Sequence, residues 1–369
     1  MAYKVPFVNY SLQYHKLEEE IDFTIKDVLD RGDLILRSDV KKFENSLAKL
    51  VGTKYAVGLN SGTDALFLSL KAAGIGQGDE VITVSHTFVA SIAAIIQVGA
   101  DPFLVDIRED FEMDVNKLEK AISEKTKVIV PVHLNGRMCD MEKIIRIAKK
   151  YKLIIVEDAA QALGAKLGGK MAGSLGLTGC FSFYPAKILG IFGDGGAITT
   201  NNRKIAEKIR LFRDHGQKTK TEILCYGYNS RLDNLHAAVL NLKMKFLSGW
   251  IKRRREIAKI YNNGLLSVSG TKLPLAPDSD KKHFDVYQNY VIRVERRDDL
   301  RAFLEERGIE TLVKDSIPNH WQKGLNLSHF KLPRTEQFSR EVISLPMYPE
   351  LTNEQIDYVI NCIKNFYSK

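Results

Sequence analysis

Cysteine is scarce in this chain, and the few that occur form no recognised spacing. The 369 residues contain four cysteines, which lie far apart and make no C-x-x-C pair. This pattern excludes a disulfide framework and a zinc ribbon, and it predicts reduced, structural thiols in a protein that needs no metal. The four residues are Cys139, Cys180, Cys225 and Cys362.

Long hydrophobic runs are also missing. The most apolar stretch, Phe88 to Ala100, is interrupted by Ser91 and Gln97 and is too short to span a bilayer. The opening residues, Met1 to Pro6, have no apolar segment like that of a signal peptide. We therefore expect a soluble, cytoplasmic protein with no membrane part.

The positive charge of the chain is not concentrated in one place. Lys and Arg number 54 against 45 Asp and Glu, for a formal net charge of +9, but both signs are mixed throughout. A basic stripe interleaved with aromatic residues, as nucleic-acid-binding proteins often carry, is missing. We therefore expect no nucleic-acid partner and favour a small acidic substrate, such as a nucleotide diphosphate.

Several common catalytic motifs do not occur. The sequence has no H-E-x-x-H, G-x-S-x-G, Walker loop or dinucleotide G-x-G-x-x-G, and its eight histidines are scattered. These absences remove the usual hydrolase, metalloenzyme and P-loop interpretations. No repeat of 20–50 residues is present, which excludes a solenoid.

Short apolar runs alternate with helix-length amphipathic segments in the first half of the chain. Alternation of this kind predicts an α/β fold with a largely parallel sheet covered on both faces. The predicted helices include Thr63–Ala73 and Met141–Tyr151. The predicted strands are residues 55–59, 80–84, 102–106, 127–132 and 153–157.

The pattern changes after residue 234. Apolar residues recur at helical spacing, which predicts one long helix linking two domains. The rest is expected to be a smaller α+β unit, so we predict a large domain at residues 1–243 and a small one at 244–369. The helical positions are Leu235, Val239, Leu242, Phe246 and Trp250, followed by a strand at 284–294 and helices at 297–307 and 353–367.

One lysine and one carboxylate stand out. Lys187 lies in Ser182-Phe183-Tyr184-Pro185-Ala186-Lys187, and Asp158 follows the apolar run at 153–157. A pyridoxal phosphate (PLP) enzyme needs such a pair, because an amine holds the cofactor as a Schiff base and a carboxylate keeps its pyridine nitrogen protonated. Ligands of open α/β sheets bind at the carboxyl ends of strands, where Asp158 is placed.

Other residues support this interpretation but have plainer alternatives. Ser61-Gly62-Thr63 opens a predicted helix and is either a phosphate site or an ordinary N-cap. Gln161 could reach the cofactor's phenolic oxygen or lie on the surface. Phe88 could stack on the pyridine ring or belong to the core. The glycine-dense stretch Gly193–Gly196 is either a tight hairpin or backbone room beside a cofactor.

Taken in order, these segments resemble the DegT/StrS-type sugar aminotransferase family of fold-type-I PLP enzymes. The resemblance implies a mostly parallel seven-stranded sheet between helices in the large domain. The stretches that carry it are residues 61–66, 78–82, 87–90, 157–161, 182–187, 193–197, 227–233 and 344–349. They are distributed over nearly the whole chain, so the combination is more specific than any one motif.

The resemblance also implies roles for matching residues. Lys187 would hold PLP, Asp158 would pair with the pyridine nitrogen, and Gln161 would contact the phenolic oxygen. Asn229 would reach the phosphate of the neighbouring subunit's cofactor, which implies a homodimer with active sites at the interface. Gly62, Thr63 and Ser182 would hold the phosphate, Phe88 would lie against the ring, and Tyr184 and His320 would lie near the sugar.

The implied reaction is a transamination in two halves. An amino acid, by resemblance L-glutamate, would give its amino group to the cofactor, which would pass it to a keto group on a nucleotide-linked sugar. A cyclitol aminotransferase, a PLP-dependent sugar dehydratase and a non-catalytic PLP-binding regulator are the alternatives. The dehydratase branch has histidine at the position of Lys187.

This chain departs from the family's pattern at three places. Ile188 replaces a common asparagine, and Arg37 replaces a common glycine. Asp315 stands where the family often has the tyrosine of Tyr-Pro-x-Pro-x-His. The identity of the nucleotide and sugar, and the carbon that receives the amine, are not readable from these residues.

Overall fold

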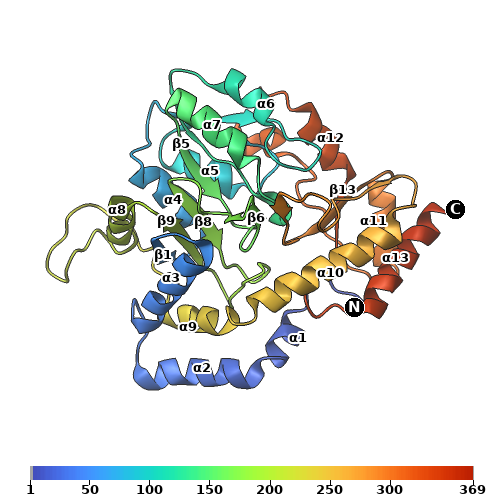
Figure 1. The fold of residues 1–369 in the computed structure, drawn as a ribbon, viewed down its shortest axis with the longest axis horizontal. Helices are drawn as coiled ribbons and strands as arrows, with labels where there is room; N and C mark the ends of the chain where they lie inside the picture. The colour runs from blue at the N-terminus through green and yellow to red at the C-terminus, as the bar shows by residue number, and fades with distance from the viewer. Residues whose placement is uncertain (1–2, 369) are drawn as a thin grey trace.

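A seven-stranded sheet forms the centre of the molecule in the computed structural model, which describes residues 3–368 (Figure 1). The strand order is β1-β9-β8-β5-β4-β2-β3, and the pairs from β8 through β3 are parallel. Only β9 runs opposite to both of its neighbours in this sheet. The predicted α/β class with a mostly parallel sheet is confirmed. The strands are β1 (Tyr55–Leu59), β2 (Glu80–Val84), β3 (Asp101–Val105), β4 (Thr126–Ile129), β5 (Ile154–Asp158), β8 (Thr178–Ser182) and β9 (Gly196–Thr200).

Helices cover both faces of this sheet, as its nearly continuous apolar strands require. One core lies under α4, α5 and α8, and a larger core lies under α3, α7 and α9. Because β5 and β8 are buried on both faces, their polar side chains emerge only at the strand ends. The helices of this part are α1 (Tyr10–His15), α2 (Glu18–Arg31), α3 (Ser38–Val51), α4 (Gly62–Ala72), α5 (Ala90–Gln97), α6 (Val115–Leu118), α7 (Met141–Tyr151), α8 (Arg203–Arg213) and α9 (Asn234–Lys243), with short 3₁₀ turns at Glu119–Ala121 and Leu134–Gly136.

The C-terminal part builds a second core around a small antiparallel sheet, β10-β12-β13. Helices α10 and α13 pack side by side against it (Figure 1). Val5 joins this core and bridges to Ile309, so the N-terminal segment crosses the boundary predicted at 243/244. The elements are α10 (Leu247–Leu265), β10 (Thr271–Lys272), β12 (Tyr290–Val294), α11 (Arg297–Glu305), α12 (Pro333–Glu341), β13 (Val342–Leu345) and α13 (Asn353–Tyr367), with 3₁₀ turns at Asn319–Trp321 and Lys323–Leu325.

Two sequence predictions are wrong in detail. The single helix expected beyond residue 234 is two helices, because hydrogen bonds at Lys245 and Phe246 run to the third residue back and turn the axis between α9 and α10. The strand expected at 284–294 is split into β11 (His283–Phe284) and β12 by a bend at Tyr287, whose φ is 50°. β11 pairs instead with the hairpin formed by β6 (Lys166–Leu167) and β7 (Lys170–Met171).

The segment after α8 extends away from the body of the molecule at the left of Figure 1. It exposes apolar side chains, among them Ile223, Leu224 and a fully exposed Tyr226. No helix within residues 3–368 combines the length and apolar content needed to cross a membrane.

Candidate active site

Lys187 lies in the loop between β8 and β9, where it is held from two directions. Its backbone N–H donates to Tyr184 O at 2.8 Å. Gln288, from the C-terminal part, accepts from Ile188 N at 2.9 Å and donates to Ala186 O at 2.7 Å. The lysine is therefore fixed between the two parts of the chain. Burial, aided by repulsion from Lys314 and opposed by Asp158, lowers the pKa of the Lys187 amine to about 8.

Asp158 ends β5 and is 6% exposed. Its Oδ2 accepts from Ser91 Oγ at 2.7 Å, and its Oδ1 accepts from Ala160 N at 3.2 Å. Ser91 is in turn within 2.9 Å of Thr87 Oγ1. These bonds fix the orientation of the carboxylate. Its negative charge acts on Lys187 and raises the pKa of the lysine. The predicted pair is thus brought together by the parallel neighbours β5 and β8.

The start of α4 meets the end of β8 and the start of β9. Ser61 caps the helix by accepting from Asp64 N at 3.0 Å, so the N-cap alternative holds for this residue. A Cβ on Gly62 would lie 2.7 Å from Ser182 Cβ, and one on Gly196 would lie 2.1 Å from Ser61 O. Both glycines are required by close backbone approach. The helix N-terminus, with the Thr63 and Ser182 hydroxyls beside it, suits a phosphate group.

The amide oxygen of Gln161 already accepts hydrogen bonds. Its Oε1 accepts from Asn135 N at 2.9 Å and from Asn289 Nδ2 at 3.1 Å. This network assigns the amide orientation and leaves Nε2 as a free donor. A donor at this place fits the predicted contact with a phenolic oxygen, and the side chain of Gln161 is half-buried.

Phe88 and Tyr184 face open space. Phe88 is 67% exposed and Tyr184 is 52% exposed, which is unusual for large aromatic side chains. The core alternative for Phe88 is therefore wrong, and its ring is available to a flat ligand. Both residues follow strand ends at the same edge of the sheet as Lys187.

His320 is held at the end of β2. Its ring is fully buried, with Nδ1 at 2.8 Å from Ser85 Oγ and Nε2 at 3.3 Å from Glu336 Oε1. These contacts fix the ring in place, and its position near the sugar stays a prediction. Asn229 is exposed at the base of the extended segment, where its backbone forms an antiparallel β-bridge with Asp214. Its contact with a second subunit stays a prediction.

Four residues of the site were not found from the sequence. Ser91, Asn135, Asn289 and Lys314 orient Asp158 and Gln161 or share the pocket with Lys187. Ser91 lies in the first turn of α5, one helical turn beyond Phe88. Its spacing from Phe88 could have identified it as a residue of the site. Asn289 joins the site through its hydrogen bond to Gln161, 128 residues away in the sequence. Lys314 joins it through Asn289 and through its charge, which acts on the distant Lys187.

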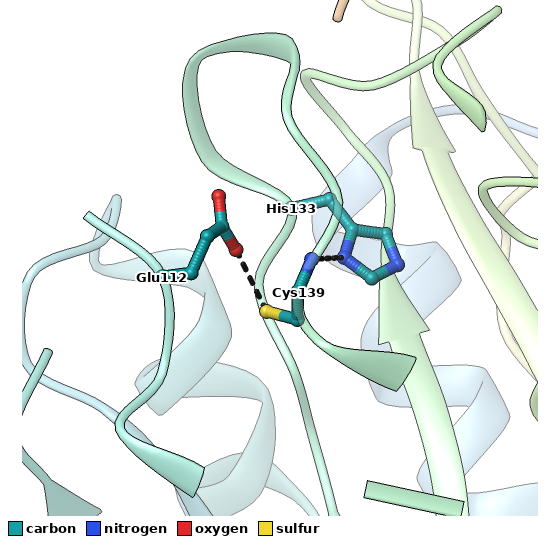
Figure 2. A group of neighbouring side chains, drawn as sticks. All are labelled: Glu112, His133 and Cys139. Atoms are coloured by element: carbon teal, nitrogen blue, oxygen red, sulfur yellow. Dashed lines mark hydrogen bonds between the residues drawn. The ribbon is translucent and has the colours of Figure 1, made fainter. Parts of the chain in front are cut away.

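A second polar cluster is formed by Glu112, His133 and Cys139 (Figure 2). Its donor atoms lie within 4.8 Å of one another. However, His133 Nδ1 accepts from Cys139 N at 3.1 Å and its Nε2 faces Glu157 Oε2 at 3.0 Å. The Cys139 thiol donates to Glu112 Oε2 at 2.7 Å, and burial raises the pKa of both groups. Since these side chains already bond to one another and to Glu157, we assign the cluster a structural role.

Glu157 ties this cluster to the strand that carries Asp158. The fully buried carboxylate accepts from Gly173 N, Leu175 N and Gly176 N at 2.6–2.9 Å as well as facing His133. We expect Glu157→Ala to lower the free energy of unfolding by about 3–5 kcal/mol, because several buried donors lose their acceptor. Urea unfolding followed by circular dichroism measures this loss.

The exposed Glu142 offers a matched control, since its ion pair with Lys282 is largely solvated. Glu142→Ala should change the unfolding free energy by less than about 1 kcal/mol. Equal losses in the two variants would contradict the anchoring role of Glu157.

Comparisons with known proteins agree with this geometry. Residues 15–364 match the model of the DegT/DnrJ/EryC1/StrS aminotransferase family. The chain is 43% identical to a "Pleiotropic regulatory protein" of Geobacillus stearothermophilus, with 98% of each chain covered. It is 42% identical to a dTDP-3-amino-3,4,6-trideoxy-alpha-D-glucose transaminase of Streptomyces venezuelae, covering 98% of this chain and 96% of that one.

Solved structures lead to the same class. The S. venezuelae DesV structure in complex with a ketimine intermediate has a TM-score of 0.96 and 40% identity, with both chains fully covered. The Bacillus subtilis NtdA structure with bound PMP has a TM-score of 0.92 and 32% identity, covering 100% of this chain and 86% of that chain. Fold and site together define a PLP-dependent aminotransferase. The chain belongs to the DegT/DnrJ/EryC1/StrS aminotransferase family.

Proposed function

We propose that this enzyme moves an amino group from L-glutamate to the keto group of a nucleotide-linked sugar. The observation that carries the proposal is the convergence of Lys187 and Asp158 at the ends of β8 and β5. Relatives that match along the full chain are named as transaminases of dTDP- and UDP-linked sugars, which supports the same substrate class here.

The residues of the site have distinct tasks. PLP, when bound, supplies the electron sink that stabilises negative charge on the substrate carbon. The amine of Lys187 would hold the cofactor at rest and would afterwards move a proton between the substrate carbon and the cofactor's C4′. Its pKa of about 8 keeps a useful fraction of the amine neutral near pH 7. This neutral fraction can accept the proton and then return it.

The surrounding groups position the cofactor. Asp158, fixed by Ser91 and Ala160, would keep the pyridine nitrogen protonated through charge pairing. Gln161 would donate from Nε2 to the phenolic oxygen. The N-terminus of α4 would take the phosphate, and Phe88 would cover the ring. Tyr184 lies exposed on the side left open to the substrate.

We also propose a cytoplasmic homodimer whose active sites lie at the interface. The exposed Ile223, Leu224 and Tyr226 on the extended segment support a partner surface, and Asn229 at its base would reach the other subunit's phosphate site. The product would be an aminosugar nucleotide for a polysaccharide such as lipopolysaccharide, for another glycan or for an antibiotic.

The alternatives have less support. Lysine at position 187 argues against the dehydratase, and an intact Lys187–Asp158 pair argues against a non-catalytic regulator, although one relative is named as a regulatory protein. A cyclitol aminotransferase would use the same cofactor residues, so it is separated by substrate alone.

A panel experiment tests the proposal. Protein converted to its pyridoxamine form is mixed with keto-sugars linked to dTDP or UDP and with a keto-inositol, and recovery of the PLP absorbance is followed. We expect recovery with at least one nucleotide-linked keto-sugar. Recovery with the keto-inositol alone would replace the proposal by the cyclitol alternative.

A further inference from the structure

A second lysine, Lys314, acts on Lys187 through its charge. Lys314 follows α11 in the segment that leads to the 3₁₀ turn at 319–321, and its Nζ donates to Asn289 Oδ1 at 3.1 Å. Asn289 also contacts Gln161, because its Nδ2 donates to Gln161 Oε1 at 3.1 Å. Lys314 is therefore linked through Asn289 to Gln161, the residue expected at the phenolic oxygen.

The ammonium of Lys314 has spare hydrogen-bonding capacity. An ammonium carries three donors, and the contact with Asn289 uses one. Among residues 3–368 no carboxylate oxygen lies within 4.0 Å of Lys314 Nζ, and this includes that of the adjacent Asp315. A half-buried cation without an ion-pair partner is costly, and burial lowers its pKa.

The carboxylates on this side of the site do not occupy the remaining N–H groups of Lys314. The charged groups that act on Lys187 are Lys314, which lowers its pKa, and Asp158, which raises it. Asp158 accepts its own hydrogen bonds from Ser91 and Ala160. Asp315, whose pKa burial raises to about 6, acts on Lys314 from beyond ion-pair distance. An incoming anion can therefore bind the N–H groups of Lys314 that Asn289 leaves free.

We propose that Lys314 is a specificity-determining residue that binds a carboxylate of the substrate through the two N–H groups that Asn289 does not use. A carboxylate matches this site because it accepts charge-assisted hydrogen bonds from an ammonium and neutralises the cation. The inference rests on the proposed function, in which such a group can come from two sources. One is the amino-acid donor, and the other is a sugar that carries an acid group.

Binding of unreactive probes separates these sources. Maleate, a dicarboxylate, stands in for the donor, and UDP-glucuronate compared with UDP-glucose isolates the carboxylate of a sugar. Dissociation constants are measured by calorimetry on the PLP-loaded protein for wild type, Lys314→Met, Lys314→Arg and the control Lys204→Met. Lys204 is an exposed lysine on α8, away from Lys187 and Lys314 in the sequence and in the fold.

We expect Lys314→Met to weaken one probe by about 10–100-fold, the effect of losing a charge-assisted hydrogen bond. Weaker maleate binding assigns the carboxylate to the donor. Loss of a preference for UDP-glucuronate over UDP-glucose assigns it to the sugar. Lys314→Arg should keep most of the binding, and Lys204→Met should keep all of it. Unchanged binding of both probes in Lys314→Met, or no binding of either by wild type, overturns the inference.

The pKa of Lys187 gives a second readout that needs no catalysis. In protein freed of PLP, the pH dependence of Lys187 labelling by an amine-selective reagent is followed by peptide mass spectrometry. Removing the like charge of Lys314 should raise the pKa of Lys187 above about 8, whereas Lys314→Arg should not. If the pH dependence of Lys187 labelling were the same in Lys314→Met as in wild type, Lys314 would have no electrostatic effect on Lys187. That result would count against the inference and leave Lys314 only a supporting contact with Asn289. If wild type failed to aminate any keto-sugar, the proposed function would be wrong, but the binding results for Lys314 would still be valid.

Discussion

Replacing Lys187 with alanine should abolish amino transfer and remove the yellow colour of the lysine-bound cofactor. The residue has two tasks, since its amine holds PLP and later moves the proton. Loss of proton transfer alone costs about 10²–10⁴-fold in rate. Lys314, the lysine whose charge acts on Lys187, is hydrogen-bonded to Asn289. We therefore do not expect it to replace the buried amine of Lys187. Steady-state rates and absorption spectra of the purified variant measure both effects.

A lysine outside the site provides the control for this experiment. Lys204 is exposed on α8, and Lys204→Ala should keep both the colour and the rate. If Lys187→Ala retained the rate of the wild type, Lys187 would have no part in the chemistry, whatever its position.

Replacing Asp158 with asparagine should reduce the rate by about 10²–10³-fold, the effect typical of removing one preorganised electrostatic contact to developing charge. The side chains are nearly the same size, and the partners Ser91 and Ala160 remain, so the change removes mainly the charge. Without that charge the pyridine nitrogen loses its proton more easily, and the electron sink is weakened. The rate of the half-reaction with L-glutamate measures the effect.

The matched control is Asp298→Asn, since that carboxylate is 82% exposed on its side chain and lies on α11. It should leave the half-reaction unchanged. A rate for Asp158→Asn within twofold of wild type would contradict the pairing of Asp158 with the pyridine nitrogen.

Local patterns in the sequence predicted the sheet well. Strands such as Tyr55–Leu59 and Glu80–Val84, and helices such as Met141–Tyr151 and Asn353–Tyr367, have the predicted bounds. Each has an apolar periodicity or a capping residue that acts within its own segment. Asp158 was found for a similar reason, because it follows the apolar run at 153–157. Lys187 was found in another way, from the stretch at residues 182–187 taken together with Asp158, since the strand before it, β8, was not predicted.

Features that depend on distant segments were not predictable in this way. The turn at Lys245 and Phe246 interrupts a periodic pattern that continues on both sides of it, so the spacing alone could not reveal two helices. Asn289 and Lys314 belong to the C-terminal part and reach the site only when it packs on the sheet. The engaged ring of His320 likewise depends on Ser85 and Glu336, which are remote from each other in sequence.

Transfer of labelled nitrogen tests the central claim most directly. Wild-type protein loaded with PLP is incubated with ¹⁵N-labelled L-glutamate and a nucleotide-linked keto-sugar, and the sugar product is analysed by mass spectrometry. The account predicts an aminosugar nucleotide that carries the ¹⁵N label, formed together with 2-oxoglutarate, and no such product from Lys187→Ala. A labelled product from Lys187→Ala at the wild-type rate, or no labelled sugar from wild type with any nucleotide-linked keto-sugar tested, would contradict it.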